Sequence, residues 1–565
     1  MQNKSEDDSN VASSSLVKDI TTLPKTLDRV SAVEFYEKTG QVELKIEFPQ
    51  EGYLWNKDFH PIPKTLRNWG AWTYFSMWIG MTWLVTVWAI GGLGIEFGLN
   101  WSQSLILMFL GNLIVLIPLI LQAHGGARYG LAESQLTRSR WGVYGAQIPS
   151  WLRAIISMGW WGIVTYIITE AATAIYVLSA GKLDALQGAT PLSLASSFPS
   201  VFWPTFIILI LVQLLLFYTS PPEKGQPVLK WLARLAAPFI IVGFLILFFS
   251  TMTKAGWNVN PVLTVPAKAT GFDSVLAIVG FTNAMIAWWA TAAFSMPDVT
   301  RFSTSQKAQV YGQIPMPLLF TMVGAMGLFS LGASMSLGLN GSAGITDPVI
   351  LAAYVLPQGL NYFVLILIML AMFIVNIYGN AIPAGYDIAN SYSKHLSWFR
   401  GMVIGVLISA ALGAWSFYSH GAYTFIYNWL LAYGTLLGAV QGIIIFDYVV
   451  IRRFKFELTD IFLTYGRFRY LGGFNPAAII SFLIGIGITY LSYWGVVINQ
   501  ITELIYANSY LSAFFISGIV YLILMVGWVI PRYQPFLKGS LRKGYYSDEV
   551  KKIFGVKEKS RSMQE

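Results

Sequence analysis

Long apolar segments recur along this chain and limit what it can fold into. There are about twelve, each with the roughly 20 residues that a helix needs to cross a bilayer core of about 30 Å. They lie at 72–94, 101–123, 150–178, 201–219, 230–252, 273–296, 312–338, 360–386, 398–417, 423–450, 477–497 and 508–530. A β-barrel is excluded because its strands alternate apolar and polar residues, and a soluble core does not contain so many long segments. The sequence therefore predicts an all-α polytopic membrane protein.

The charges indicate how the segments are oriented. Only 12% of residues are charged, against about 25% in soluble proteins. Lys and Arg gather in alternate loops, which hold Arg128, Arg138, Arg140, Lys224, Lys230, Arg234, Arg301, Lys307, Lys394, Arg400, Arg452, Arg453, Lys455, Arg467 and Arg469. The other loops offer only Lys182, Lys254 and Lys268. The positive-inside rule places the first set, and both termini, on the cytoplasmic side of a cytoplasmic (plasma) membrane. This bias also accounts for the net charge of +9 without a nucleic-acid partner.

Three regions follow from the polarity of the chain. Residues 1–60 are polar and mixed in charge and are expected to form a cytoplasmic N-terminal tail without a cleavable signal. The membrane domain occupies 61–530, and 531–565 form a basic cytoplasmic C-terminal tail. The chain has no cysteine, so a disulfide framework and a thiolate metal site are excluded.

The expected chemistry is transport, not catalysis. The four histidines lack metal-ligand spacing, and the chain has no glycine-rich phosphate loop with its lysine. The segments do not cluster the acids or histidines that a membrane-embedded enzyme would need. We therefore expect a secondary transporter or a channel, with no metal and no cofactor.

Two adjacent tryptophans, Trp288 and Trp289, stand within segment 273–296, shortly before Pro297, Asp298 and Arg301. Tryptophans at bilayer depth commonly pack against other helices or face lipid. A pair beside a helix end can instead form one wall of a site for a flat ring. The residues alone leave both interpretations open.

Short motifs spread from about residue 64 to 500 carry a family resemblance. They are Arg67-Asn68-Trp69-Gly70, Gly111-Asn112, His124-Gly125-Gly126, Gly159-Trp160-Trp161-Gly162, Pro297-Asp298 with Arg301-Phe302, Asn376 and Asn380 with Asp387, Asp447-Tyr448 with Arg452-Arg453, and Gly473-Phe474-Asn475-Pro476. In this order and spacing the chain resembles the nucleobase-cation-symport type 1 family, which contains permeases for cytosine, purines, uracil, thiamine, allantoin and hydantoins.

The resemblance implies a LeuT-like fold with two inverted repeats of five helices. Repeat one would occupy about 72–252, repeat two about 273–450, and two extra helices about 477–530. In such folds the substrate binds near the midplane, where the first helix of each repeat is broken. Gly80 and Gly280 are the positions where we expect these breaks.

The resemblance also implies the substrate site. Family members sandwich the substrate ring between tryptophans that correspond to Trp160 and Trp289, and an asparagine that corresponds to Asn380 reads its edge. Two glutamines of hydantoin-type relatives are replaced here by Gly80 and Val164, so the hydrogen-bond pattern is expected to differ. Replacement contacts are open among Thr82, Thr165 and Asn283.

The same carry-over predicts a degenerate sodium site. Its main-chain positions are Ser76, Ile79 and Ala371, while Ile374 and Val375 stand where sodium-coupled relatives have hydroxyls. Aliphatic side chains cannot coordinate Na⁺, so proton coupling is the better expectation. Glu170 is the candidate proton carrier, because an acid within a membrane segment is costly and commonly functional. A structural acid near the extracellular end is the alternative.

The functional prediction is a symporter that imports a nucleobase or related heterocycle, such as cytosine, a purine, uracil, allantoin or hydantoin, by alternating access. The alternatives are a transporter of thiamine or an amino acid on the same fold, or a transporter-derived sensor. The expected partners are the small heterocycle and the lipid bilayer. A monomer fits this function, and the sequence leaves the oligomeric state open.

Overall fold

A computed structural model describes residues 33–44, 54, 58, 60–186, 188–189, 191–220, 227–413, 424–455, 457–464 and 466–534. The predicted C-terminal tail lies almost wholly outside these residues, as do most of the predicted N-terminal tail and Lys224. The described part is helical apart from one short hairpin. It contains nine helices long and apolar enough to cross a membrane, or up to ten if one bent pair is counted as a single span.

Helices occupy all twelve predicted segments, although those of segments 398–417 and 477–497 are shorter, with 15 and 14 residues. In repeat one they are α2 (Ala71–Thr82) with α3 (Val85–Glu96), α4 (Trp101–Tyr129), α7 (Gln147–Ser179), α9 (Pro199–Tyr218) and α10 (Pro227–Lys254). In repeat two they are α12 (Gly271–Trp288) with α13 (Ala290–Thr300), α14 (Gln306–Gln313) with α15 (Met316–Ser336), α17 (Leu360–Val375) with α18 (Ile382–Asn390), α19 (Trp398–Leu412) and α21 (Ala432–Ile445). The C-terminal helices are α22 (Pro476–Thr489) and α24 (Ser509–Leu524).

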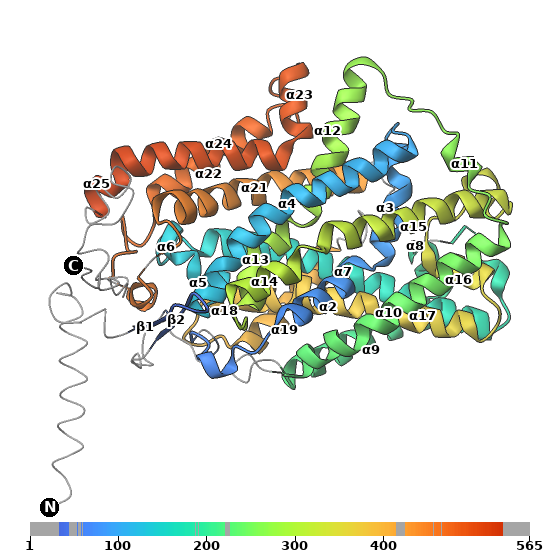
Figure 1. Ribbon diagram of the computed structural model, residues 1–565, viewed down its shortest axis with the longest axis horizontal. Coiled ribbons are helices and arrows are strands. Elements are labelled where there is room, and N and C mark those ends of the chain that lie inside the picture. Colours follow the sequence, from blue (N-terminus) through green and yellow to red (C-terminus); the bar gives the residue numbers. More distant parts are fainter. Residues whose placement is uncertain are drawn as a thin grey trace, which may run out of the picture.

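Shorter elements connect these helices. They are α5 (Glu133–Leu136), α6 (Arg138–Trp141), α8 (Pro191–Ser197), α11 (Asn260–Leu263), α16 (Pro348–Val355), α23 (Gln500–Ala507) and α25 (Ile530–Tyr533), with β1 (Val33–Tyr36) and β2 (Gln41–Leu44). Short 3-10 turns lie at Lys64–Leu66, Leu183–Leu186, Gly341–Ala343 and Thr459–Phe462, and π-helical segments at Asn376–Ala381, Thr424–Leu431, Phe446–Ile451 and Met525–Val529. The arrangement is the LeuT-like fold of two five-helix repeats followed by two further helices (Figure 1).

The first helix of repeat one is broken, but not at Gly80. Helix α2 ends at Thr82, Leu84 is extended, and α3 begins at Val85 with its axis turned by 57°. Gly80 lies inside α2, where a Cβ atom would come within 2.2 Å of Ile374 Cγ2 on α17. Gly80 therefore allows α2 and α17 to approach closely. The bend itself lies at Leu84, two residues after the end of α2.

The corresponding helix of repeat two is interrupted at Trp289, not at Gly280, although Gly271–Thr300 still runs as one span. Trp289 separates α12 from α13 with φ −95° and ψ 3°, and its backbone N–H bonds to the carbonyl of Ile286 at 3.1 Å. Pro297 does not end the segment, since α13 continues through it to Thr300. Trp288 is thus the last residue of α12, and Trp289 is the irregular residue in the middle of the span.

The eighth spanning segment contains a π-helical turn, Asn376–Ala381, between α17 and α18. Such turns insert one extra residue into a helix and are frequent at functional sites. Here the turn carries Asn376 and Asn380, two of the residues that marked the family resemblance. All six of its residues are buried.

One end of the helix bundle, which we call the basic end, gathers Arg67, Arg128, Arg138, Arg301 and Arg452. The hairpin β1–β2 lies at this end, beside α5 in the view of Figure 1 and in contact with α4. Arg67 donates to the carbonyl of Val42 at 2.9 Å, and Gln41 donates to the carbonyl of Ser303 at 2.7 Å. Part of the segment that we expected to be a tail is therefore folded against the membrane domain.

Candidate functional site

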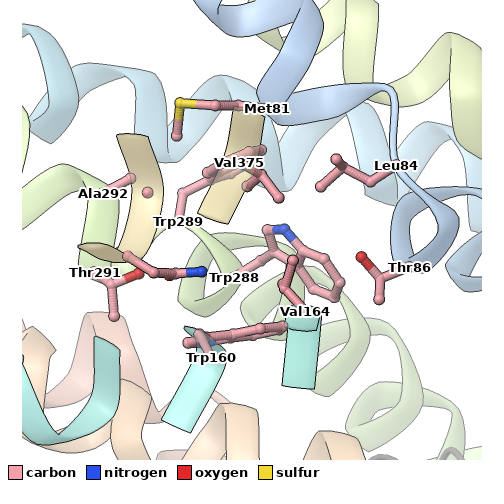
Figure 2. Close-up of a pocket in the computed structure, with 12 residues that line it drawn as sticks. Met81, Leu84, Thr86, Trp160, Val164, Trp288, Trp289, Thr291, Ala292 and Val375 are labelled. Carbon is pink, nitrogen blue, oxygen red and sulfur yellow. The ribbon is translucent and has the colours of Figure 1, made fainter. Parts of the chain in front are cut away.

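A pocket lies where α2–α3 and α12–α13 meet α7 and the π-turn. It is lined by Met81, Leu84, Thr86, Trp160, Val164, Trp288, Trp289, Thr291, Ala292, Val375, Gly379 and Asn380. In Figure 2, Met81 lies above the other labelled side chains and Trp160 below them, with Trp288 between the two. Both irregular turns thus contribute to one cavity, as the fold requires of a midplane substrate site.

Trp160, on α7, forms one aromatic wall. Its ring centroid lies 5.0 Å from that of Trp288, with the two planes inclined at 60°. The indole N–H of Trp160 donates to the hydroxyl of Tyr433 at 3.2 Å, and this hydroxyl donates to the carbonyl of Ala287 at 3.0 Å. These two bonds hold the Trp160 ring against the end of α12.

Trp289 lines the same pocket and is held from a different side. Its indole N–H donates to Oδ1 of Asn112 on α4 at 2.6 Å. Its ring lies edge-on to Trp78, at 5.0 Å between centroids, and to Phe320, at 5.7 Å. The family resemblance assigned the second aromatic wall to Trp289, and the structure places Trp288, the other member of the pair, on the pocket as well.

Asn380 supplies a side-chain amide to the pocket from the π-turn. Its Nδ2 donates to Oδ1 of Asn376 at 3.0 Å. Arg153 and Ser157 of α7 hold the same turn by its main chain, since they donate to the carbonyls of Gly379 and Asn380, each at 3.0 Å. These bonds hold the backbone that carries the side-chain amide of Asn380.

Of the two residues that replace the glutamines of hydantoin-type relatives, only one lines the pocket. Val164 lines the pocket. Gly80 is not among its lining residues in the described chain, because Ile374 occupies the space beside it. Of the open replacement contacts, Thr82 bonds within α2 to the carbonyl of Trp78, and Asn283 bonds Ser509 of α24. Thr165 lies behind the wall, where it accepts from Asn376.

The residues at the sodium positions have apolar or satisfied side chains. Ile374 packs against Gly80, and Val375 lines the pocket. The hydroxyl of Ser76 donates to the carbonyl of Trp72 at 2.8 Å, a bond within its own helix. Ile79 and Ala371 are buried and bring no side-chain oxygen. Coordination at this point would depend on main-chain carbonyls.

Glu170 lies on α7, beyond the pocket and away from the basic end. Its side chain is fully buried, and neither carboxylate oxygen has a hydrogen-bond partner among the described residues. Its carboxyl interacts with that of Asp347, which caps α16 by accepting from the N–H of Val349 at 2.8 Å. Burial raises the pKa of Asp347. Two buried carboxyl groups that interact in this way are stable only when at least one of them is protonated.

Several residues of this region were not singled out by sequence reasoning. Arg153 is fully buried and lies 3.8 Å from Asp387, atom Nε to Oδ2. Gln213, on α9, is buried and bonds the amide of Asn376. Both are polar residues within apolar segments, which is the signal that would have found them. Asp447 and Arg452 form an ion pair at 2.5 Å, and Asp298 accepts from the backbone N–H of Glu133 at 2.9 Å.

The comparisons agree with this geometry. Residues 61–520 match the family model described as permease for cytosine/purines, uracil, thiamine, allantoin. The purine-uracil permease NCS1 of Arabidopsis thaliana is 29% identical over 84% of this chain and 78% of its own length. The allantoin permease of Bacillus subtilis (strain 168) is 27% identical over 86% of this chain and 96% of its own length.

A solved structure confirms the fold. The transporter Mhp1 of the nucleobase-cation-symport-1 family, in a closed conformation with bromovinylhydantoin bound, aligns with a TM-score of 0.67 at 18% identity. The alignment covers 86% of this chain and 99% of that chain. With the family model matched over nearly all of the membrane domain, the chain is an integral membrane transporter and not an enzyme, and it belongs to the nucleobase-cation-symport type 1 family of permeases.

Proposed function

We propose that this protein is a secondary active symporter that imports a nucleobase or a related neutral heterocycle by alternating access. The observation that carries the proposal is the pocket, where the rings of Trp160, Trp288 and Trp289 stand beside the amide of Asn380. Stacking on an aromatic side chain contributes about 1–3 kcal/mol per base and tolerates many flat rings. An amide matches the paired donor and acceptor at the edge of a lactam.

The charge of the lining favours this class over the alternatives. None of the described residues that line the pocket carries a charged side chain. Cationic thiamine and a zwitterionic amino acid would both be desolvated there without an ionic partner, which is costly. A neutral ring such as uracil, cytosine, a purine, allantoin or hydantoin has no such cost.

Proton coupling through Glu170 is the second part of the proposal. The aliphatic residues at 374 and 375 remove two oxygen ligands that sodium-coupled relatives place there. Glu170 is buried on the same helix as Trp160, so its protonation state can bias that helix between two arrangements. The proposed orientation has both termini in the cytoplasm, following the distribution of Lys and Arg.

Uptake in a transport-deficient host tests the proposal. Labelled uracil, cytosine, adenine, allantoin and hydantoin would be supplied singly, with thiamine and an amino acid as comparators. We expect accumulation of at least one neutral ring, loss of accumulation with a proton uncoupler, and no change when Na⁺ is replaced by choline. Uptake of thiamine or the amino acid alone would reject the substrate class. Affinity that rises steeply with Na⁺ in purified protein would reject the coupling ion.

A further inference from the structure

A chain of buried amides leads from the pocket wall into the protein. Asn380 donates to Oδ1 of Asn376 at 3.0 Å, and Asn376 in turn donates to Oε1 of Gln213 on α9 at 2.9 Å. Nδ2 of Asn376 also lies 2.9 Å from Oγ1 of Thr165 on α7. Asn376, Gln213 and Thr165 are fully buried, so none of these groups exchanges its partner for water.

Two main-chain carbonyls determine which end of each amide donates and which accepts in this series of hydrogen bonds. Nε2 of Gln213 lies 3.3 Å from the carbonyl oxygen of Leu209, and Nδ2 of Asn376 lies 3.3 Å from that of Trp161. A carbonyl can only accept, so each amide must turn its nitrogen toward it. Rotating either amide by half a turn would set two oxygens against each other in a buried site, and leave a donor unpaired.

The orientation of the Asn376 amide in turn determines the orientation of the Asn380 amide at the pocket. Because its nitrogen is committed to acceptors, its Oδ1 faces Asn380 and can only accept from that residue's Nδ2. Oδ1 of Asn380 then has no hydrogen-bond partner among the described residues, although Asn380 lines the pocket. That oxygen is the acceptor left for a ligand.

We propose that Asn376 and Gln213 are positioning residues that hold Asn380 with its oxygen toward the substrate, so that the site selects rings with an N–H at this edge. The inference rests on the proposed function and narrows its substrate class. A different role for the amides is simple helix-to-helix bonding among α7, α9 and the π-turn, which is common in membranes. That role would affect folding but not the choice between substrates.

The wild-type protein provides the first test. Uracil, 1-methyluracil and 3-methyluracil, and the same series of hydantoins, would compete against the labelled ring that the protein accumulates. Methylation at the N–H that meets Asn380 should weaken competition by about tenfold or more, because a methyl group replaces the donor and leaves the oxygen unpaired. Methylation at the other nitrogen should have a smaller effect.

The variants Asn376→Leu and Gln213→Leu provide the second test. Asn376→Leu frees the amide of Asn380 to rotate, so the ratio between the N–H ring and its N-methyl analogue should fall toward one. Gln213→Leu removes one acceptor of Asn376, which the carbonyl of Trp161 still orients, so the ratio should fall by less. Thr165→Val removes one acceptor at nearly constant volume and should shift the ratio in the same direction by less. Asn283→Leu is the matched control, since it removes a buried amide that bonds Ser509 instead, and should leave the ratio unchanged.

The outcomes separate the inference from the function on which it rests. Wild-type protein that takes up none of the panel would overturn both. Uptake of a ring with equal competition by all its methyl analogues would overturn the inference alone. The same follows if folded Asn376→Leu or Thr165→Val protein keeps the full wild-type ratio. A ratio that falls in these variants and not in Asn283→Leu supports it.

Discussion

At the scale of single residues, the pocket depends on tryptophans with separate supports. Trp160 is held by Tyr433, and Trp289 by Asn112, so neither indole N–H needs the substrate as a partner. Both rings can therefore offer their faces while their polar edges are satisfied. Trp288 connects the two walls, because its ring contacts that of Trp160 and it directly precedes Trp289 in the chain.

Trp160→Ala and Trp289→Ala should each weaken substrate binding by about 1–3 kcal/mol through the loss of one ring face. Trp289→Phe should retain part of the affinity, since a ring remains while the bond to Asn112 is lost. Binding of the transported ring to purified protein measures this. Trp231→Ala, at a side chain 56% exposed on α10, is the control and should bind normally. Unchanged affinity in well-expressed Trp289→Ala would show that this tryptophan only packs.

Glu170→Gln should abolish accumulation driven by a proton gradient while exchange of substrate across the membrane continues. Glutamine resembles the protonated acid in shape and polarity but cannot release a proton. Counterflow and uncoupler-sensitive uptake in vesicles distinguish the two activities. If Glu170→Gln still accumulates substrate against its gradient, Glu170 is a structural acid. The neighbouring variant Thr169→Ala, which loses a bond within its own helix, serves as the control.

At the scale of elements, the sequence predicted the segments well and their interruptions poorly. All twelve apolar segments contain helices, because segment length and hydropathy are local properties. The breaks were placed at glycines and lie instead at Leu84 and Trp289, where tertiary contacts decide the backbone. The π-turn at Asn376–Ala381 has no local signal either. Trp160, Trp288, Trp289 and Asn380, which the sequence analysis singled out, line the pocket. Gln213 and Arg153, which it did not, take their places through packing between distant segments.

Gly80 has a role in packing that can be measured. Gly80→Ala would place a Cβ atom 2.2 Å from Ile374 Cγ2, so α2 and α17 must separate. We expect a loss of about 1–3 kcal/mol in stability, as for other overpacked cores. Adding Ile374→Ala should restore part of this loss. Thermal unfolding in detergent measures both, with Gly487→Ala as the control because no atom lies within 4 Å of its Cβ position. Equal melting temperatures would contradict the tight contact.

At the scale of the whole molecule, the basic end joins segments that are far apart in the sequence. Arg138 donates to the carbonyl of Leu54 at 2.9 Å and to Asn390 at 2.5 Å. Arg301 donates to the carbonyls of Asp58 and His60, and Asp58 accepts from the N–H of Trp398 at 2.7 Å. Leu54, Asp58 and His60 thus join α6 in repeat one to the ends of α13 and α19 in repeat two.

The proposed orientation can be tested with single cysteines, since the chain has none. Lys182→Cys, in an exposed turn after α7, should react with an impermeant thiol reagent added to intact cells. Arg467→Cys, at the basic end, should react only after the cells are opened. Labelling of permeabilised cells controls for access to each position. The reverse labelling pattern would show that the protein has the opposite orientation in the membrane, against the positive-inside rule.

The break between α2 and α3 places two helix ends, and so the electric field of their dipoles, at the pocket. A helix carries about half a positive charge at its first turn and half a negative charge at its last. The end of α2 and the start of α3 both lie at the pocket, because Met81, Leu84 and Thr86 line it. A field therefore crosses the cavity although no ionised group is present in its lining. A neutral solute with a large dipole moment can align with this field, so polarity without net charge becomes a criterion by which the transporter recognises its cargo.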